Sequence, residues 1–338
     1  MCGIVGILNL TQEAPINEHA IRQMLAMVRH RGPDEFGIYL EDQVGLGSAR
    51  LSIIDLSGGQ QPISNEDETL WIVFNGEIFN YVELRPELER KGHQFRTNSD
   101  TETILHLYED HGPACLKYLN GQFAIAIWDT RNNSLFLARD RLGIRPLFYA
   151  TANDKLIFGS EIKAILAEGT QQANIDPLGI DQVFTYWSTQ TPHTSFVGIK
   201  EIPPGHFLLA QQNDFRIEQY WRINFPSLDE TPSWANHDEF IDEFRELLID
   251  STKIRLRADV PVGAYLSGGL DSSVTSTIIR NYTGNQLDTF SISFSDAQFD
   301  ESVYQIQMAK FLGTEHQVVR VSYDDIRDIF PKVIWHSE

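Results

Sequence analysis

The chain has 338 residues, 42% of them hydrophobic and 22% charged, which is typical of a globular protein long enough for two domains. Its 27 basic and 47 acidic residues give a net charge of −20, which disfavours nonspecific binding to nucleic acid or to an anionic membrane. Two cysteines exclude a disulfide framework, and without a basic signal region or a bilayer-spanning apolar run the sequence predicts a cytoplasmic protein.

The N-terminus carries a cysteine at its second position, in the string Met1-Cys2-Gly3-Ile4. Removal of the initiator methionine leaves Cys2 with a thiol and a free α-amine, whose ordinary pKa values are near ~8.5 and ~7.7–8.0. The amine can accept the thiol proton, so one residue supplies both nucleophile and base. The alternative is an ordinary N-terminal cysteine without a role. Cys115 lies in an apolar stretch and is expected to be a buried structural thiol.

Short strands mixed with a few helices are predicted over the next part of the chain. Strand patterns cover residues 3–8, 44–54, 70–75, 123–129, 134–139, 147–150 and 156–160. Helix patterns follow three capping residues, the second and third within capping boxes: Asn17, Asn80 with Glu83, and Ser99 with Glu102. Gly92 is expected to end the second helix. Strands with helices on their outer faces favour a layered α/β or α+β domain.

The ten histidines show no spacing typical of a metal site. His106 and His111 are too far apart for one helix face. We therefore interpret them as residues at the surface and at the end of a helix.

The composition changes near residue 203, and residues 223–236, rich in Pro, Ser, Asp, Glu and Thr, are interpreted as a linker. An amphipathic helix capped by Asn236 follows. Strands ending at 266 and covering 289–294 and 316–321 then alternate with helices over 272–282 and 302–312, which predicts a mostly parallel sheet. Because so few strands follow the linker, we expect a fragment of a longer protein.

A glycine-rich loop, Ser267-Gly268-Gly269-Leu270-Asp271-Ser272-Ser273, lies where a predicted strand turns into a helix. Its backbone N–H groups, serine hydroxyls and helix N-terminus are suited to a phosphate group. Asp271 would repel bare phosphate but suits Mg²⁺. The loop is not a Walker A loop, since it lacks the Gly-Lys-[Ser/Thr] ending. The alternative is a glycine-rich turn with a serine cap.

Several motifs together resemble a known family. The 267–273 loop resembles the pyrophosphate-binding motif of ATP pyrophosphatases. Six further strings resemble motifs of the class II glutamine amidotransferase domain. They lie at residues 1–4, 31–34 (Arg-Gly-Pro-Asp), 75–77 (Asn-Gly-Glu), 99–100, 140–147 and 159–164. In this order, and over essentially the whole chain, the set resembles the glutamine-hydrolysing asparagine synthetase family.

The resemblance implies a two-domain architecture. Residues 2–222 would form an α+β N-terminal-nucleophile sandwich (αββα), the glutaminase domain. Residues 223–236 would be the linker. Residues 237–338 would be the N-terminal part of an incomplete α/β parallel-sheet synthetase domain, similar to ATP pyrophosphatases.

The resemblance also implies roles in glutamine hydrolysis. Cys2 would attack the carboxamide of glutamine and form a γ-glutamyl thioester, with the Asn75 side chain and the Gly76 backbone N–H as oxyanion donors. Arg50 would hold the α-carboxylate, Glu77 and Asp100 the α-ammonium, and the backbone of Leu51, Ile53 and Ile54 would line the pocket. The 31–34 loop would be a flap over glutamine.

Each residue also has another interpretation. Asn75-Gly76 fits a type I′ hairpin turn. Asp100 fits a helix cap, Arg50 a surface ion pair, and residues 31–34 a plain loop.

For the second domain the resemblance implies adenylation of aspartate by ATP, followed by displacement of AMP by ammonia. The ATP- and pyrophosphate-binding residues would be Leu266, Ser267, Gly268, Gly269, Asp271, Ser272 and Ile292. Asp271 would also contact Mg²⁺. Glu338 lies at the position where similar proteins have a glutamate near the ammonia-attack step.

The implied function is ATP-dependent asparagine synthesis by a carbon–nitrogen ligase that takes glutamine, aspartate and ATP, with a homodimer as its assembly and no nucleic-acid or membrane partner. One alternative is an amidotransferase of this architecture acting on another carboxylate, in peptide or polysaccharide biosynthesis. Another is a non-catalytic glutamine-binding fragment.

Overall fold

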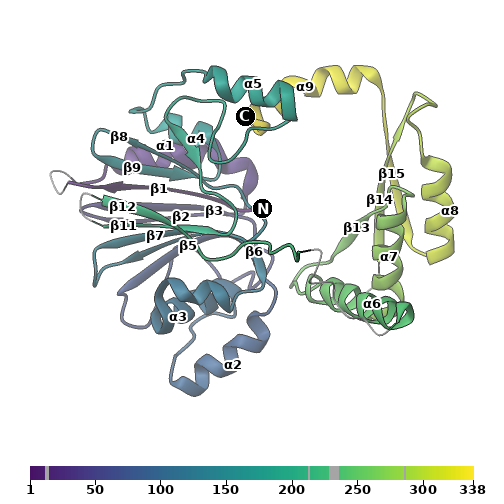
Figure 1. Ribbon diagram of the computed structural model, residues 1–338, viewed down its shortest axis with the longest axis horizontal. Helices are drawn as coiled ribbons and strands as arrows, with labels where there is room; N and C mark the ends of the chain where they lie inside the picture. Colours follow the sequence, from purple (N-terminus) through teal and green to yellow (C-terminus); the bar gives the residue numbers. More distant parts are fainter. Residues whose placement is uncertain (12–14, 212–213, 228–235, 285–286) are drawn as a thin grey trace. The chain divides into compact units, whose positions relative to one another are not determined.

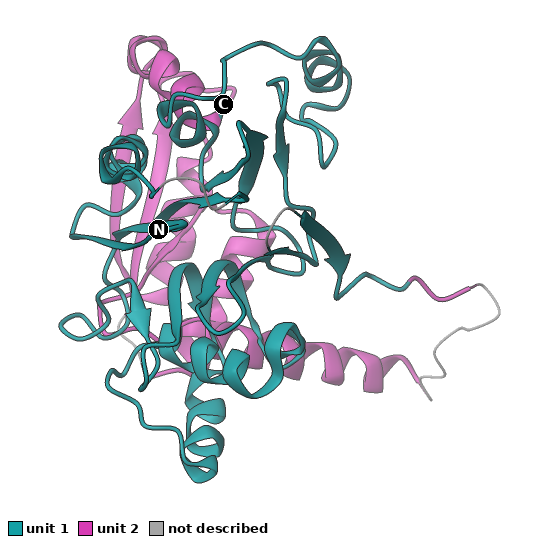
Figure 2. Ribbon diagram, turned by 90° about the vertical axis from the view of Figure 1, so that its left-hand side faces the viewer, with its two compact units in different colours: residues 1–224, 338 teal, residues 225–337 magenta. Residues whose placement is uncertain are grey.

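The computed structural model describes residues 1–11, 15–211, 214–227, 236–284 and 287–338. The chain separates into two compact units, residues 1–224 together with Glu338 and residues 225–337, which Figure 2 colours separately. Of the predicted linker 223–236, residues 228–235 lie outside the described residues. Among the helices described, none is both long enough and apolar enough to cross a membrane.

The first unit contains two six-stranded sheets in which neighbouring strands are antiparallel (Figure 1). The first sheet has the order β10 (Ile199–Glu201), β8 (Phe148–Ala152), β9 (Lys155–Gly159), β1 (Gly3–Asn9), β3 (Val44–Arg50) and β2 (Glu35–Glu41). The second has the order β12 (Asp214–Gln219), β11 (His206–Gln211), β7 (Ser134–Arg139), β6 (Gly121–Asp129), β5 (Leu70–Ile78) and β4 (Ile63–Ser64).

Helices cover both outer faces of this pair of sheets. Helices α1 (Glu18–Val28) and α4 (Ile162–Ala167) pack on the first sheet, and α2 (Tyr81–Lys91) and α3 (Asp100–His111) pack on the second. Between the sheets lies a separate apolar cluster that includes Ile4, Leu46, Val73, Trp128 and Leu137. The unit is therefore an αββα sandwich, which confirms the predicted fold. Helix α5 (Pro177–Tyr186) and two 3₁₀ helices (Arg29–Arg31 and Gly112–Lys117) complete it.

The ends of α1 and α2 show where local sequence sets the structure. The Asn17 side chain accepts a hydrogen bond from the backbone two residues on (2.9 Å), and Gly92 ends α2 with φ at 109°, both as predicted. The prediction of a capping box at Asn80 is wrong, because the Asn80 side chain makes no capping hydrogen bond to α2. Its side chain instead donates to the Tyr118 carbonyl (2.9 Å) and accepts from the Asn120 N–H (2.9 Å).

Two interior predictions have opposite outcomes. Cys115 is fully buried, as expected. His106 is also fully buried, so its interpretation as a surface residue is wrong. Helix α3 contacts α2, β5 and the 3₁₀ helix that follows it, and this packing leaves almost none of its length at the surface.

The second unit alternates strands with helices. In chain order it contains α6 (His237–Ile254), β13 (Gly263–Tyr265), α7 (Leu270–Tyr282), β14 (Asp288–Phe294), α8 (Ser302–Leu312), β15 (Glu315–Val321) and α9 (Tyr323–Ser337). The strands form a parallel sheet in the order β13-β14-β15, which confirms the predicted α/β arrangement. The Asn236 side chain accepts from the Glu239 N–H (2.8 Å) and begins α6.

Candidate functional site

Cys2 immediately precedes β1, which lies between β3 and β9 in the first sheet. Ser160, just after β9, makes two hydrogen bonds to Ile4 near the start of β1. Its hydroxyl accepts a hydrogen bond from the Ile4 N–H and its own N–H donates to the Ile4 carbonyl, both at 2.9 Å. Ser160 therefore helps to hold the strand that positions the cysteine.

Arg31 provides a second anchor for Cys2. Its Nε donates to the Cys2 carbonyl (3.0 Å), while its Nη1 lies 2.9 Å from the buried Glu161 carboxylate. Ion pairs with Arg31 and Lys163 hold the pKa of Glu161 below its usual value against the opposing effect of burial. At Gly32 a Cβ atom would fall 2.1 Å from the Ala49 carbonyl oxygen, so the 31–34 loop packs tightly against β3.

The thiol of Cys2 faces the segment after β3. Its Sγ atom accepts a hydrogen bond from the Leu51 N–H (3.4 Å) and lies 3.7 Å from the Leu51 carbonyl oxygen. Burial raises the pKa of the Cys2 thiol. A nucleophile at this position therefore needs a neighbouring base to take its proton.

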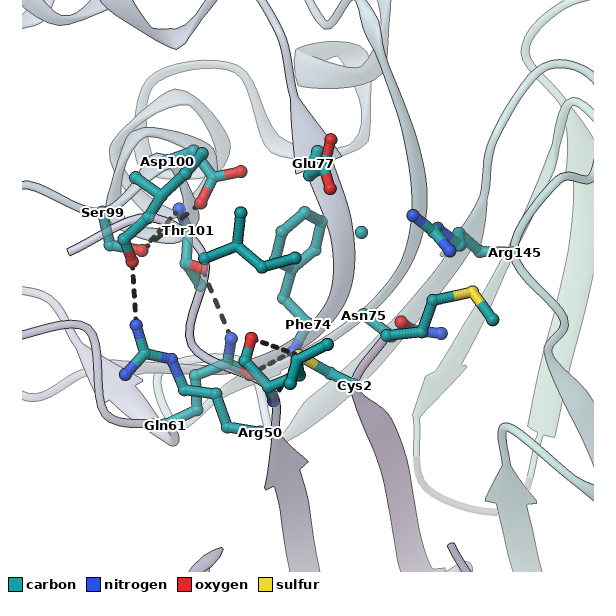
Figure 3. A pocket seen from close by; sticks show the side chains of 15 residues that line it. Cys2, Arg50, Gln61, Phe74, Asn75, Glu77, Ser99, Asp100, Thr101 and Arg145 are labelled. Atoms are coloured by element: carbon teal, nitrogen blue, oxygen red, sulfur yellow. Dashed lines mark hydrogen bonds between the residues drawn. The ribbon is translucent and has the colours of Figure 1, made fainter. Parts of the chain in front are cut away.

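The cysteine opens into a cavity of about 60 Å³ in the first unit (Figure 3). Every residue predicted for glutamine hydrolysis or glutamine binding lines it: Cys2, Arg50, Leu51, Ile53, Ile54, Asn75, Gly76, Glu77 and Asp100. The lining also includes Met1, Gln61, Phe74, Ser99, Thr101 and Arg145.

Asn75 and Gly76 lie within β5, in register with Ala124 and Phe123 of β6, so the hairpin-turn interpretation is wrong. Asn75 is fully buried, and neither its Nδ2 nor its Oδ1 atom has a hydrogen-bond partner among the described residues. A Cβ atom at Gly76 would fall 2.1 Å from the Gln122 carbonyl oxygen, so only glycine fits. The cavity therefore holds an amide group ready for a ligand, because buried polar groups are rarely left unpaired.

Arg50 is buried rather than part of a surface ion pair. It contacts Glu35 through Nη1 (2.7 Å) and donates from Nη2 to the carbonyls of Ile54 and Asp55 (2.8 Å each). These bonds fix the segment that forms one wall of the cavity.

Asp100 is the first residue of α3, and Ser99 is the cap, accepting from the Thr101 N–H (3.2 Å). The Asp100 carboxylate instead accepts from the Ile78 N–H (2.9 Å). Burial raises the pKa of Asp100 to about 6, and the nearby charge of Glu77 acts in the same direction. Two carboxylates thus share the cavity.

Arg145 was not singled out by the sequence, although it lies in the 140–147 string. It is 8% exposed, and burial lowers its pKa. Its Nε atom has no hydrogen-bond partner within the described part of the chain. The Asp140 carboxylate shapes its loop by accepting from the N–H groups of Phe123, Ile144 and Arg145 (2.9–3.1 Å). The only earlier signal was its place in that string.

Gln61 is another residue of the cavity wall that the sequence did not indicate. Its Oε1 atom accepts from the Phe74 N–H (2.7 Å) and its Nε2 atom lies 3.4 Å from the Thr101 hydroxyl (Figure 3). It therefore ties β5 to the first turn of α3 at the cavity wall.

The predicted phosphate loop lies in the second unit, between β13 and α7. The Ser267 and Ser272 hydroxyls are 2.9 Å apart, and the Ser267 hydroxyl accepts from the Gly269 N–H (3.2 Å). Gly268 has φ at 82°, and a Cβ there would fall 2.7 Å from the Tyr304 Cβ, so the loop needs glycine. Asp271 is exposed in the first turn of α7.

The other residues predicted to bind ATP lie beside this loop. The Leu266 N–H donates to the Phe290 carbonyl of β14 (2.9 Å), and the Ser291 hydroxyl donates to the Leu266 carbonyl. Ile292 is about half exposed on β14. Glu338 is grouped with the first unit, where its carboxylate accepts from the Lys163 N–H (2.8 Å), and its role stays a prediction.

Comparison with known protein families divides the chain close to the boundary between the two compact units. Residues 1–221 match the glutamine amidotransferase domain family, and residues 243–338 match the asparagine synthase family. A solved structure of the glutamine phosphoribosylpyrophosphate amidotransferase from Bacillus subtilis shares the fold, with a TM-score of 0.50 at 18% identity over 94% of this chain and 65% of that one.

Among curated relatives, asparagine synthetase [glutamine-hydrolyzing] 1 of Bacillus subtilis is 39% identical over 100% of this chain and 53% of its own length. Amidase chyE of Penicillium rubens is 35% identical over 100% of this chain and 53% of its own length. The chain thus spans about half the length of the curated relatives it matches. Because an amidotransferase domain family matches most of its residues and these relatives match it from end to end, this chain belongs to the glutamine-hydrolysing asparagine synthetase family.

Proposed function

We propose that this protein hydrolyses glutamine in its first unit and uses the ammonia for the ATP-dependent conversion of aspartate to asparagine. The observation that carries the proposal is the fully buried Asn75 amide, unpaired among the described residues, in the same cavity as Cys2. An amide in such a position is suited to the oxyanion that forms when a thiolate attacks a carboxamide.

The first reaction follows from Cys2 once Met1 is removed. The α-amine takes the thiol proton, and Sγ bonds to the carboxamide carbon of glutamine. Asn75 Nδ2 and the Gly76 N–H donate to the oxyanion. Collapse breaks the carbon–nitrogen bond, the α-ammonium returns its proton to the leaving nitrogen, and ammonia departs. Water then hydrolyses the thioester to glutamate and restores the Cys2 thiol. Burial lowers the pKa of the amine at Met1, and the same effect on a Cys2 amine would keep it unprotonated and available as a base.

The charges of the cavity support an α-amino acid as the substrate. Two guanidinium groups, Arg50 and Arg145, and two carboxylates, Glu77 and Asp100, line it. An α-carboxylate fits the first pair and an α-ammonium the second. The backbone of residues 51, 53 and 54 would complete the glutamine-binding wall, and the 31–34 loop would be the flap.

Glutamine binding is expected to weaken as the pH falls through about 6. Asp100, whose pKa is about 6, is ionised above this value and attracts the α-ammonium, and it becomes neutral below it. The KM for glutamine should therefore rise by up to about tenfold per pH unit below that pKa, with a smaller change in kcat. Steady-state glutaminase kinetics across this range measure the effect.

Two variants test the assignment. Asp100→Asn should raise KM at neutral pH and remove its dependence on pH in this range, because no charge remains to titrate. Asp176→Asn is the matched control, since Asp176 begins α5 by accepting from the Leu178 N–H and is not part of the cavity wall. A wild-type KM that stays flat through pH 6 would contradict the role given to Asp100.

The second unit would bind ATP through the 267–273 loop, with Leu266 and Ile292 beside the adenosine. Asp271, an exposed carboxylate at the start of α7, suits the hard Mg²⁺ ion that accompanies ATP. The proposal also includes a glutaminase domain over residues 2–222 and a synthetase domain over residues 237–338. It further includes a cytoplasmic location and a homodimeric assembly. Glu338 would act near the ammonia-attack step.

The test is aspartate-stimulated release of pyrophosphate from ATP, measured with the full-length gene product. Stimulation by aspartate with asparagine formed from glutamine supports the proposal. Glutaminase activity without that stimulation would favour another acceptor carboxylate.

A further inference from the structure

The outer face of the first unit carries a group of histidine and glutamate side chains that glutamine hydrolysis does not use. Glu66 lies in the turn between β4 and β5, His93 follows the end of α2, and His106 and Glu109 are one turn apart on α3. One ligand atom from each residue lies within 4.8 Å of the other three. We refer to these four residues as the His–Glu cluster.

The distances within the His–Glu cluster are slightly longer than those between the ligands of a small metal ion. Glu109 Oε2 is 3.6 Å from His93 Nδ1 and 3.7 Å from His106 Nδ1. Glu66 Oε2 is 3.7 Å from His106 Nδ1, and Glu66 Oε1 is 4.0 Å from His93 Nδ1. Four ligands placed tetrahedrally about 2.0–2.2 Å from a zinc ion are roughly 3.3–3.6 Å apart. A small inward movement therefore completes a tetrahedral site.

The polar atoms at the centre of the cluster lack other partners. His106 is fully buried, and neither of its ring nitrogens has a hydrogen-bond partner among the described residues. The same holds for Glu109 Oε2. A buried imidazole with two unpaired nitrogens is costly unless it binds something, and Nδ1 of His106 faces both glutamates.

Carboxylates also lie behind both imidazoles. Asp110 Oδ1 is 3.0 Å from His93 Nε2, and Glu102 Oε1 is 3.6 Å from His106 Nε2. Histidine ligands of metals usually donate their other ring nitrogen to such a group, which orients the ring and makes Nδ1 the free ligand atom. Asp110 is thus placed to orient the His93 ring, and Glu102 would orient the His106 ring after a small movement.

We propose that the His–Glu cluster binds one Zn²⁺ ion as a structural site. Two neutral imidazoles and two carboxylates bring a charge of −2, which Zn²⁺ neutralises, and a nitrogen–oxygen set of four at tetrahedral spacing suits this ion. The ion joins the β4–β5 turn and the segment after α2 to α3. The first turn of α3 supplies Ser99, Asp100 and Thr101 to the glutamine cavity, so the ion would steady one of its walls.

The experiment measures zinc in the full-length protein, purified without chelators, by elemental analysis. One zinc per chain is expected. After stripping with a chelator, added Zn²⁺ should raise the thermal midpoint by on the order of 5 °C, and added Co²⁺ should give the visible absorption of a tetrahedral site. His93→Gln should lose the bound zinc and both responses.

His111→Gln is the matched control, because His111 is on the same helix but outside the cluster. It should keep the zinc and both responses. A wild-type protein without bound metal, and without any response to Zn²⁺ or Co²⁺, would overturn the proposal. A His93→Gln protein that retains full zinc would overturn it equally. The cobalt titration of the wild-type protein decides the matter even if His93→Gln does not fold.

Discussion

Replacement of Cys2 by alanine is expected to lower glutamine hydrolysis by at least about 10³-fold, because no other thiol lines the cavity. Amide synthesis supported by added ammonia should continue, since the loop proposed to bind ATP lies in the second unit. Release of glutamate from glutamine measures the first activity. Pyrophosphate release in the presence of ammonium salts measures the second.

Cys115→Ala is the matched control for this experiment. Cys115 is a fully buried thiol beneath α3, where burial raises its pKa far above the usual value. This variant should keep full glutaminase activity, even if its thermal midpoint falls. Substantial glutamine hydrolysis by Cys2→Ala would refute the nucleophile assignment, whatever the result for the acceptor.

Replacement of Asn75 by alanine should reduce kcat for glutamine hydrolysis by about 10²–10³-fold, equivalent to about 2.7–4 kcal/mol, with little change in KM. The reason is that the Asn75 amide would meet the substrate oxygen most strongly in the transition state. The stability of the protein should hardly change, because no described residue hydrogen-bonds to this amide. Kinetics and thermal unfolding of the same preparation test both parts.

Asn80→Ala should show the reverse pattern. Its side chain makes two hydrogen bonds, to the Tyr118 carbonyl and from the Asn120 N–H, outside the cavity. Loss of these bonds should cost roughly 1–3 kcal/mol of stability and leave kcat unchanged. Equal losses of kcat in the two variants would refute the oxyanion role of Asn75 and indicate a general structural effect.

Local interactions explain which elements the sequence predicts well. Asn17, Ser99 and Asn236 each accept a hydrogen bond from a backbone N–H two or three residues further along, so their helices begin where the pattern places them. The strand at 70–75 was predicted too short. Pairing with β6 continues it to Ile78, and this contact lies far away in the sequence.

The missed elements and residues depend on distant partners. Strand β2 (Glu35–Glu41) is only partly buried and forms an edge of its sheet, so its sequence lacks a strong apolar pattern. The motifs located the cysteine and the cavity residues that resemble the family. They did not reveal Arg145, whose loop is shaped by Asp140, or Gln61, which links β5 to α3.

The position of β1 in the middle of its sheet has a consequence for how the cavity at Cys2 forms during synthesis. One neighbour of β1 is β3, at residues 44–50, but the other is β9, at residues 155–159. Ser160 and Glu161, which complete the anchoring of β1 and Arg31, come later still. Contacts between residues so far apart in sequence form slowly. Although Cys2 is made long before Ser160 and Glu161, it reaches its final position only after about half of this chain has been made. Until then β1 presents an unpaired edge to other chains.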